Sequence, residues 1–274
     1  MKQRIITACF LLVLFAGMLF FAPQPVWALF CGLITILATY EFCGMTPMSN
    51  IFRNIYLVFM SATMAISFIY PPNQQTLSLL SIIVLAFWLL LVPLWLKLKL
   101  DLLKNKVIAA EVGFILFFPF WYALSNLKQT TGATSLLLIL AIVWIADSTA
   151  YFVGKAIGKN KLAPSISPGK SWEGAAGGLA GVIIYTLILY FSGSLKNIFN
   201  SLNANTPSII ILIVLATFLT IVSIYGDLFE SWLKRCANIK DSSNLLPGHG
   251  GVFDRIDALI TVLSLISACQ ILFL

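Results

Sequence analysis

Seven of the ten acidic residues of this chain lie in two polar segments of an otherwise apolar sequence. We call residues 147–174 zone one and residues 226–258 zone two; zone two also contains the only histidine, His249. Carboxylates that are not accompanied by cysteines are hard oxygen ligands, which suit Mg2+ or Mn2+. The grouping therefore predicts a magnesium-dependent site, with one or two cations, to which both zones contribute.

Basic residues and glycines give zone two the character of a phosphate-binding segment. Lysine and arginine neutralise phosphate oxygens, and arginine does so through two parallel hydrogen bonds. Gly250 and Gly251 follow His249, and residues without a Cβ let backbone N–H groups approach a phosphate closely. A divalent cation beside such a segment predicts phosphoryl or nucleotidyl transfer. The role of His249 stays open, because a lone histidine in a turn is as often structural as functional.

The spacing of polar residues in zone two predicts the helical faces that carry them. Four residues at positions 0, 3, 4 and 7 share one face of a helix that continues the eighth apolar span. They are Asp227, Glu230, Ser231 and Lys234. Asp254 and Asp257 form an i, i+3 pair at the start of the last span, where Asp254 could also be a helix N-cap. Capping does not explain five acids near one histidine, so we favour a functional role.

Zone one begins with a carboxylate inside an apolar span. An acidic residue at membrane depth indicates a functional site by default, so we include Asp147, with Tyr151 one helical turn further along the same face. Residues 167–171, "SPGKS", supply hydroxyls and a lysine without the P-loop spacing, and their alternative role is to anchor a loop to lipid headgroups. Glu41 and Glu111 lie near the inner ends of spans but belong to no motif, so we leave both outside the site.

The composition is that of an all-α polytopic membrane protein. Hydrophobic residues make up 60% of the chain and charged residues 10%, whereas a soluble domain is about one-quarter charged. A helix needs about 20 mostly apolar residues to cross a bilayer, where backbone groups find no partner outside their own helix. We expect one membrane domain, with N-terminal spans in 1–133 and a catalytic half in 134–274. Nine segments qualify as spans: 5–22, 26–43, 54–70, 77–96, 107–126, 134–153, 174–193, 207–225 and 256–274.

The distribution of basic residues predicts the orientation of these spans. With the N-terminus inside, 15 of the 17 Lys and Arg residues fall in inner loops, and only Lys128 and Lys196 fall outside. The positive-inside rule then places the N-terminus inside and the C-terminus outside, with both zones on the cytoplasmic side. Anionic inner-leaflet lipid accounts for the net charge of +7, so we expect membrane lipids and no nucleic acid as partners. The first span is long for a signal peptide, and we interpret it as a retained helix.

Residues 231–257, "SWLKRCANIKDSSNLLPGHGGVFDRID", resemble the signature of the phosphatidate cytidylyltransferases, or CDP-diacylglycerol synthases. All fixed positions are met: S-x-hydrophobic-K-R, then K-D, then P-x-H-G-G-hydrophobic-x-D-R-hydrophobic-D. Zone one is similar to the family's D-x-x-A-Y and S-P-x-K-[ST]-x-E-G segments, with Gly169 where many members have lysine. The resemblance rests on the last half of the chain, and the first five spans agree with it only in hydropathy.

This resemblance implies transfer of CMP from CTP to phosphatidate, which gives CDP-diacylglycerol and pyrophosphate. It also implies a Mg2+-dependent enzyme of the inner membrane, often a homodimer; glycine-rich residues 174–181 suit close helix packing and are a candidate dimer interface. By motif position, Asp227 and Asp254 are the expected metal ligands and catalytic residues. The other expected catalytic residues are Asp241, Asp257, Lys234, Arg235 and His249. The expected substrate-binding residues are Asp147, Tyr151, Ser167, Lys170, Ser171, Glu173, Ser231, Lys240, Gly250, Gly251 and Arg255.

Two other functions stay open at the level of the sequence. A CTP-dependent kinase for polyprenol or diacylglycerol would use similar ligands, but it would phosphorylate a hydroxyl and need a base beside it. An ion transporter would place its acids near the membrane midplane, whereas most acids here lie with lysine and arginine at one face. We therefore expect a nucleotidyltransferase first and a lipid kinase second.

Overall fold

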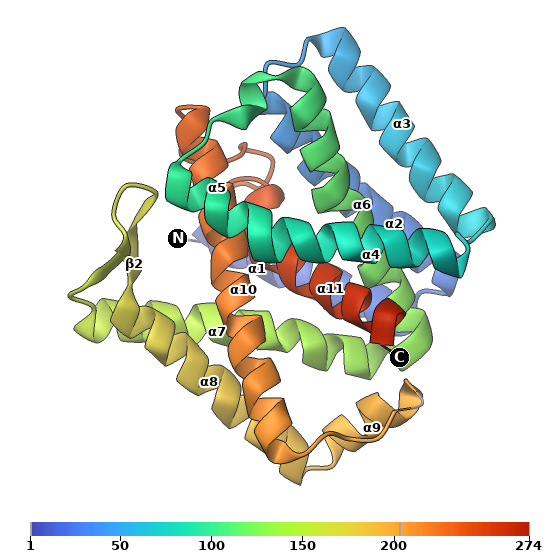
Figure 1. The fold of residues 1–274 in the computed structure, drawn as a ribbon, viewed down its shortest axis with the longest axis vertical. Helices are drawn as coiled ribbons and strands as arrows, with labels where there is room; N and C mark the ends of the chain where they lie inside the picture. The colour runs from blue at the N-terminus through green and yellow to red at the C-terminus, as the bar shows by residue number, and fades with distance from the viewer. Residues whose placement is uncertain (1, 203, 274) are drawn as a thin grey trace.

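The computed structural model describes residues 2–202 and 204–273, and its fold is drawn in Figure 1. In chain order its elements are α1 (Lys2–Phe21), α2 (Gln24–Gly44), α3 (Asn50–Ile69), α4 (Gln74–Ala86), the π-helix η1 (Phe87–Leu91), α5 (Val92–Leu98), the 3-10 helix η2 (Leu102–Lys104), α6 (Lys106–Thr131), α7 (Ala133–Ile157), β1 (Lys161–Ala163), β2 (Ser167–Ser171), α8 (Trp172–Phe191), α9 (Ser194–Ser201), α10 (Ile209–Cys236) and α11 (Phe253–Phe273). The helices form a bundle, and the hairpin of β1 and β2 projects from one end of it.

Eight helical segments of the described residues are long and apolar enough to cross a membrane. They correspond to the second to ninth spans expected from hydropathy, so the chain is a multi-pass membrane protein. The segment expected at 207–225 is longer in the structure, because the polar face of zone two continues α10 to Cys236. The first expected span corresponds to α1, in which Ile6–Phe21 form a shorter apolar helix. A ninth crossing therefore stays a prediction.

The helix α11 lies at the centre of the bundle, where it contacts α2, α4, α6, α7 and α10. Every residue from Ala258 to Leu265 is buried, so this part of the helix is enclosed on all sides. Gly226 lets α10 approach α11 closely, since a Cβ there would lie 3.0 Å from the carbonyl oxygen of Asp257. The central helix thereby fixes the acidic residues at its N-terminal end.

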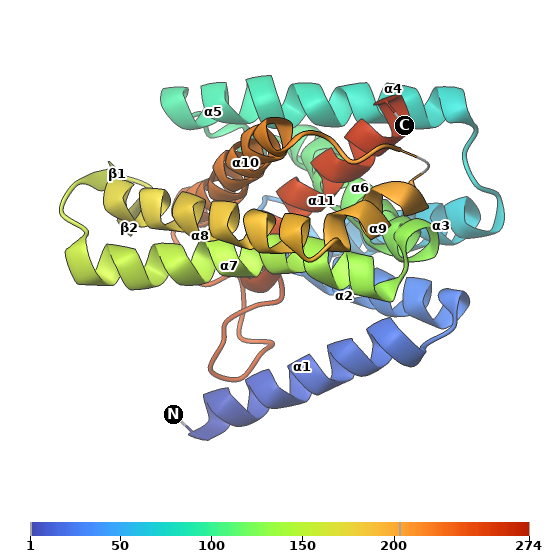
Figure 2. The ribbon, with the colours of Figure 1, turned by 90° about the horizontal axis from the view of Figure 1, so that it is seen from below.

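The helices α7 and α8 run side by side, as both Figure 1 and Figure 2 show. Glycines of α8 make this close approach possible. A Cβ on Gly174 would lie 2.9 Å from the carbonyl oxygen of Ala150, and one on Gly178 would lie 3.0 Å from that of Ala146. The glycines of α8 thus pack against α7 of the same chain. The surface that was a candidate dimer interface is therefore covered within one chain.

Zone one contains a short β-hairpin between α7 and α8, which departs from the all-helical prediction. The strands β1 and β2 are antiparallel, with Lys161 opposite Ser171 and Ala163 opposite Ser167. The hairpin lies outside the membrane-spanning segments, so the rule that favours helices in lipid does not apply to it. Its turn is closed by a hydrogen bond from the N–H of Ile166 to the carbonyl oxygen of Ala163.

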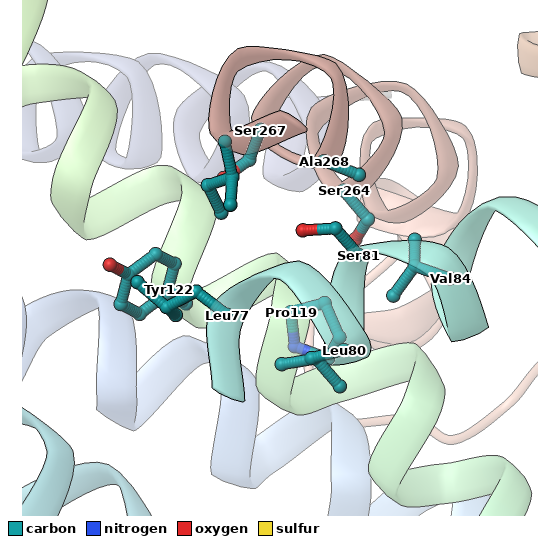
Figure 3. Close-up of a pocket in the computed structure, with 10 residues that line it drawn as sticks. Leu77, Leu80, Ser81, Val84, Pro119, Tyr122, Ser264, Ser267 and Ala268 are labelled. Carbon is teal, nitrogen blue, oxygen red and sulfur yellow. The ribbon is translucent and has the colours of Figure 1, made fainter. Parts of the chain in front are cut away.

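Two cavities lie away from the polar zones. A cavity of about 10 Å3 lies between α4, α6 and α11, beside Pro119, and has room for about one water molecule (Figure 3). Its lining includes the hydroxyls of Ser81, Ser264 and Ser267. A larger cavity of about 200 Å3 lies beside the start of α2 and is lined by residues such as Gln24, Ser67 and Ser125. Figure 2 shows α1 on the outside, where it contacts α2 and α7.

Candidate active site

The two polar zones meet at the end of the bundle where α7, α8, α10 and α11 approach one another. Lys170 of β2 forms an ion pair with Asp227 of α10, with Nζ 2.5 Å from Oδ2. Arg235, at the end of α10, donates a hydrogen bond from Nε to the carbonyl oxygen of Ile166 at 3.1 Å. The side chains of Lys170 and Asp227 are 24% and 32% exposed, so solutes can reach this pair. These contacts agree with the expectation that both zones contribute to one site.

Lys234 lies between two carboxylates in the interior of this region. Its Nζ is 2.6 Å from Oε2 of Glu230, one turn earlier on α10, and 2.8 Å from Oδ1 of Asp254 on α11. All three side chains are at most 13% exposed. The expected face of α10 is therefore present, and its lysine ties α10 to the first turn of the central helix.

Asp254 accepts hydrogen bonds from the loop that precedes α11. The backbone N–H groups of Gly251 and Ser242 donate to Oδ2 at 2.7 and 2.9 Å, and the Ser242 hydroxyl donates at 3.0 Å. Because α11 begins at Phe253, Asp254 lies inside its first turn and is not a simple N-cap. Both of its oxygens have partners in the chain, so a cation at Asp254 would have to share or replace one of them.

Two further acids lie near Asp227, so that three carboxylates are grouped there. Asp147 of α7 and Asp257 of α11 both interact electrostatically with Asp227 and with Lys170. Oδ1 of Asp257 accepts a hydrogen bond from the N–H of Ala258 at 2.8 Å. One nearby lysine does not balance three carboxylates, so the region has an excess of acidic groups. Among residues 2–202 and 204–273, no three or more acidic, histidine or cysteine side chains are arranged to hold a metal ion by themselves.

The glycines and the histidine of zone two form a tight turn. The N–H of Leu246 donates to the carbonyl oxygen of Gly250, and Gly250 has a φ of +82°, which favours glycine. Arg255 donates from Nε and Nη2 to the carbonyl oxygen of His249, at 2.9 and 2.6 Å. Within the described residues, Nδ1 of His249 is buried without a hydrogen-bond partner. The expected phosphate ligand Arg255 thus stabilises the turn in this structure.

Several expected substrate ligands of zone one have structural partners. The Ser171 hydroxyl accepts a hydrogen bond from the N–H of Gly174 at 3.1 Å and caps α8. Glu173 accepts hydrogen bonds from the backbone and side chain of Asn160, the latter at 2.7 Å. Tyr151 is 61% exposed. The capping of α8 by Ser171 explains this residue without a substrate.

The remaining expected residues lie around the same region. Ser231 is buried and its hydroxyl lies 3.4 Å from Oδ1 of Asp227, a weak contact. Ser167 is the first residue of β2, and Lys240 and Asp241 are exposed on the loop after α10. Gly251 donates its N–H to Asp254, so this group is engaged within the chain. Ligand roles for these residues stay predictions.

Sequence reasoning left Glu41 outside the site, and it placed Glu230 on the polar face of zone two without a role of its own. Glu41 of α2 accepts hydrogen bonds from zone two, including the N–H groups of Val252 and Phe253. Glu230 shares Lys234 with Asp254, as described above. The signal for Glu41 was its burial depth alone, because an acid at the inner end of a span indicates function by default. No local motif connects it with residues about 200 positions later.

The comparisons with known proteins cover nearly the whole chain. The cytidylyltransferase family matches residues 2–273. A phosphatidate cytidylyltransferase of Pseudomonas aeruginosa is 37% identical over 271 residues, which cover 98% of this chain and 96% of the relative. Proteins of the same name from Haemophilus influenzae and Thermotoga maritima are 33% and 32% identical, and cover 94% and 96% of this chain and 94% and 93% of their own lengths. With its signature segments assembled at one end of the bundle, the chain belongs to the cytidylyltransferase family.

Proposed function

We propose that this chain transfers CMP from CTP to phosphatidate, which gives CDP-diacylglycerol and pyrophosphate. The relatives described above are named for this activity. The observation that carries the proposal is the ion pair between Lys170 and Asp227. It joins the two polar segments into one partly exposed site that contains both carboxylates and basic side chains. Basic side chains can bind the phosphates of two polyanionic substrates, and carboxylates can bind the metal ions that accompany them.

The basic residues of the site suit the handling of phosphate groups. Attack of the phosphatidate phosphate on the α-phosphate of CTP brings two polyanions together, and their repulsion must be neutralised. Lys170 and Arg235 lie at the junction of the zones, where they can bind phosphate oxygens, and Lys240 lies on the exposed loop. Phosphatidate is already ionised near neutral pH, so the reaction needs no strong general base. A binding role for His249 rests on its motif position, because its Nδ1 is buried in this structure.

The carboxylates of the site suit magnesium. Mg2+ prefers oxygen ligands and typically takes one or two carboxylates, with waters and substrate phosphates in its other positions. Asp227 fits this demand best, because it is partly exposed and lies within an excess of acidic groups. Asp254 is the second proposed ligand, and would exchange Ser242 or Lys234 for the cation. When bound, Mg2+ would neutralise phosphate charge and stabilise the departing pyrophosphate.

We also propose that the site faces the cytoplasm from the inner membrane, with the N-terminus inside and the C-terminus outside. The support is the positive-inside distribution of Lys and Arg. A groove open to lipid would let the acyl chains stay in the bilayer while the headgroup reaches the site. A homodimer is proposed from the family resemblance alone, with its interface outside the α7–α8 seam.

The assay that tests this function uses purified protein, phosphatidate and CTP labelled at either the α- or the γ-phosphate. Label from the α-position should enter the lipid and label from the γ-position should leave as pyrophosphate. Removal of divalent cations with EDTA should abolish the transfer, and added Mg2+ should restore it. Transfer of the γ-label to lipid would instead identify a CTP-dependent kinase and would overturn the proposal.

A further inference from the structure

The carboxylate of Glu41 lies in the half of the chain that the signature motifs do not cover, yet it contacts zone two. Glu41 is near the end of α2 and is 2% exposed. Oε1 accepts hydrogen bonds from the Ser243 hydroxyl at 2.5 Å and from the N–H of Val252 at 2.9 Å. Oε2 accepts from the N–H of Phe253 at 2.7 Å and from the Ser242 hydroxyl at 3.0 Å.

Three of these four donors lie in the segment 237–252, which joins α10 to α11 and which we call the site loop. The fourth is the N–H of Phe253, the first residue of α11. Two of the donors are backbone N–H groups at the start of α11, which have no acceptor inside the helix. A carboxylate is favoured there by the helix dipole. Within the described residues no basic side chain forms an ion pair with Glu41. Its buried charge is therefore stabilised by the site loop and the helix end.

Glu41 is linked to Asp254 through Ser242. The Ser242 hydroxyl lies 3.0 Å from Oε2 of Glu41 and 3.0 Å from Oδ2 of Asp254, although it has one hydrogen to donate. Gly251 fits between the same groups, because a Cβ there would lie 2.5 and 2.6 Å from the two oxygens of Glu41. The contacts of Glu41 thus determine where the site loop and Asp254 lie, and they explain the glycine at position 251.

We propose that Glu41 is a positioning residue of the active site. From α2 it holds Ser242 and Ser243 of the site loop together with the start of α11, and it thereby sets the position of Asp254 and of the turn that contains His249. Glu41 does not touch the substrates and acts through Ser242 and the start of α11. This inference rests on the proposed function for its catalytic consequence, while the ordering of the loop by Glu41 can be measured without it.

The first arm of the test compares hydrogen–deuterium exchange in wild-type protein, Glu41→Gln and Glu111→Gln, all as full chains in detergent. Glutamine keeps the shape of glutamate but places an NH2 group against two of the four donors. Exchange should become about 10-fold faster or more in peptides that cover 237–253. The N–H groups of Val252 and Phe253 lose their carboxylate acceptor, and the site loop opens more often. Glu111 is exposed on α6 and serves as the matched control. Unchanged exchange in the site loop, or faster exchange spread over the whole chain, would overturn the proposal.

The second arm measures CMP transfer by the same three proteins. Loss of a supporting carboxylate should lower kcat by about 10- to 100-fold and raise the Mg2+ concentration for half-maximal rate. A purely structural defect would lower the active fraction and leave that Mg2+ concentration unchanged, which would contradict a positioning role. Absence of transfer in the wild type would remove the proposed function, and the exchange arm would still decide whether Glu41 orders the loop.

Discussion

At the scale of single residues, Lys234 holds a charged group in a nearly buried position. One ammonium group neutralises two carboxylates, Glu230 and Asp254, and all three side chains are almost excluded from solvent. Removing one partner of a buried ion pair leaves uncompensated charge in a medium of low dielectric constant, which costs far more than the pair contributes. The role of Lys234 in stability is therefore separable from any role in phosphate binding.

Replacement Lys234→Met should lower the free energy of unfolding by about 3–5 kcal/mol, because it keeps the volume of the side chain and removes its charge. Denaturant titration in micelles, followed by tryptophan fluorescence, measures this change. Lys104→Met is the control, since Lys104 is 81% exposed in its pair with Asp101 and surface pairs contribute little. Equal stability of the two variants would show that the buried triad is not needed for folding.

At the scale of elements, the contact between α7 and α8 depends on glycines, which have no side chain to keep the helices apart. Glycines let the two helices approach until the backbone of one touches the backbone of the other. Such packing supplies attraction where lipid offers no hydrophobic drive for helix association. The hairpin that carries Lys170 is held by the ends of these same two helices, so their spacing determines where Lys170 lies.

Replacement Gly174→Ala should destabilise the protein by about 1–3 kcal/mol, because the new Cβ meets the carbonyl oxygen of Ala150 and forces the helices apart. This steric cost outweighs the higher helix propensity of alanine. The matched control is Gly17→Ala in α1, where a Cβ meets nothing within 4 Å. Thermal unfolding of both variants in detergent measures the difference. A Tm for Gly174→Ala at or above the wild-type value would contradict the close packing of α7 and α8.

The elements also show how far the sequence could predict this structure. Spans follow from long apolar runs, and the face of α10 follows from local spacing, so both were predictable from neighbouring residues. The β1–β2 hairpin was not, because "SPGKS" has no alternation of apolar and polar residues. Ser171 was interpreted as a substrate ligand, although a serine three residues before a backbone N–H of a helix is equally an N-cap. Glu41 was missed because its partners are about 200 residues away.

At the scale of the whole molecule, the two ends of the bundle differ in character. One end carries both polar zones and most of the basic residues, while the other carries α9 and the cavity beside Gln24. Contacts such as the hydrogen bond from Gln74 to the carbonyl oxygen of Ile271 join helices at that second end. This polarity supports the proposed orientation, in which the basic end faces the cytoplasm.

Cysteine labelling in intact cells tests that orientation. Ser165→Cys lies in the hairpin turn and Asn197→Cys lies in α9, at opposite ends of α8. In a background with the five native cysteines replaced by serine, a membrane-impermeant maleimide applied from outside should modify position 197 only. Position 165 should react with the maleimide only after the inner face of the membrane has been made accessible to the reagent. Labelling of position 165 from outside would reverse the proposed topology, and retained CMP transfer shows that the background protein is folded.

The place of Glu41 has a consequence for how the protein retains its nucleotide. The N-terminus of a helix is a ready anion site in many phosphate-binding proteins, and α11 begins beside the proposed active site. Here that position is filled by the protein's own carboxylate. Under the proposed function, the triphosphate of CTP would depend on the ammonium and guanidinium groups at the aqueous edge of the site, whose attraction is screened by dissolved ions. We therefore expect the affinity for nucleotide to fall as the ionic strength of the surrounding solution rises.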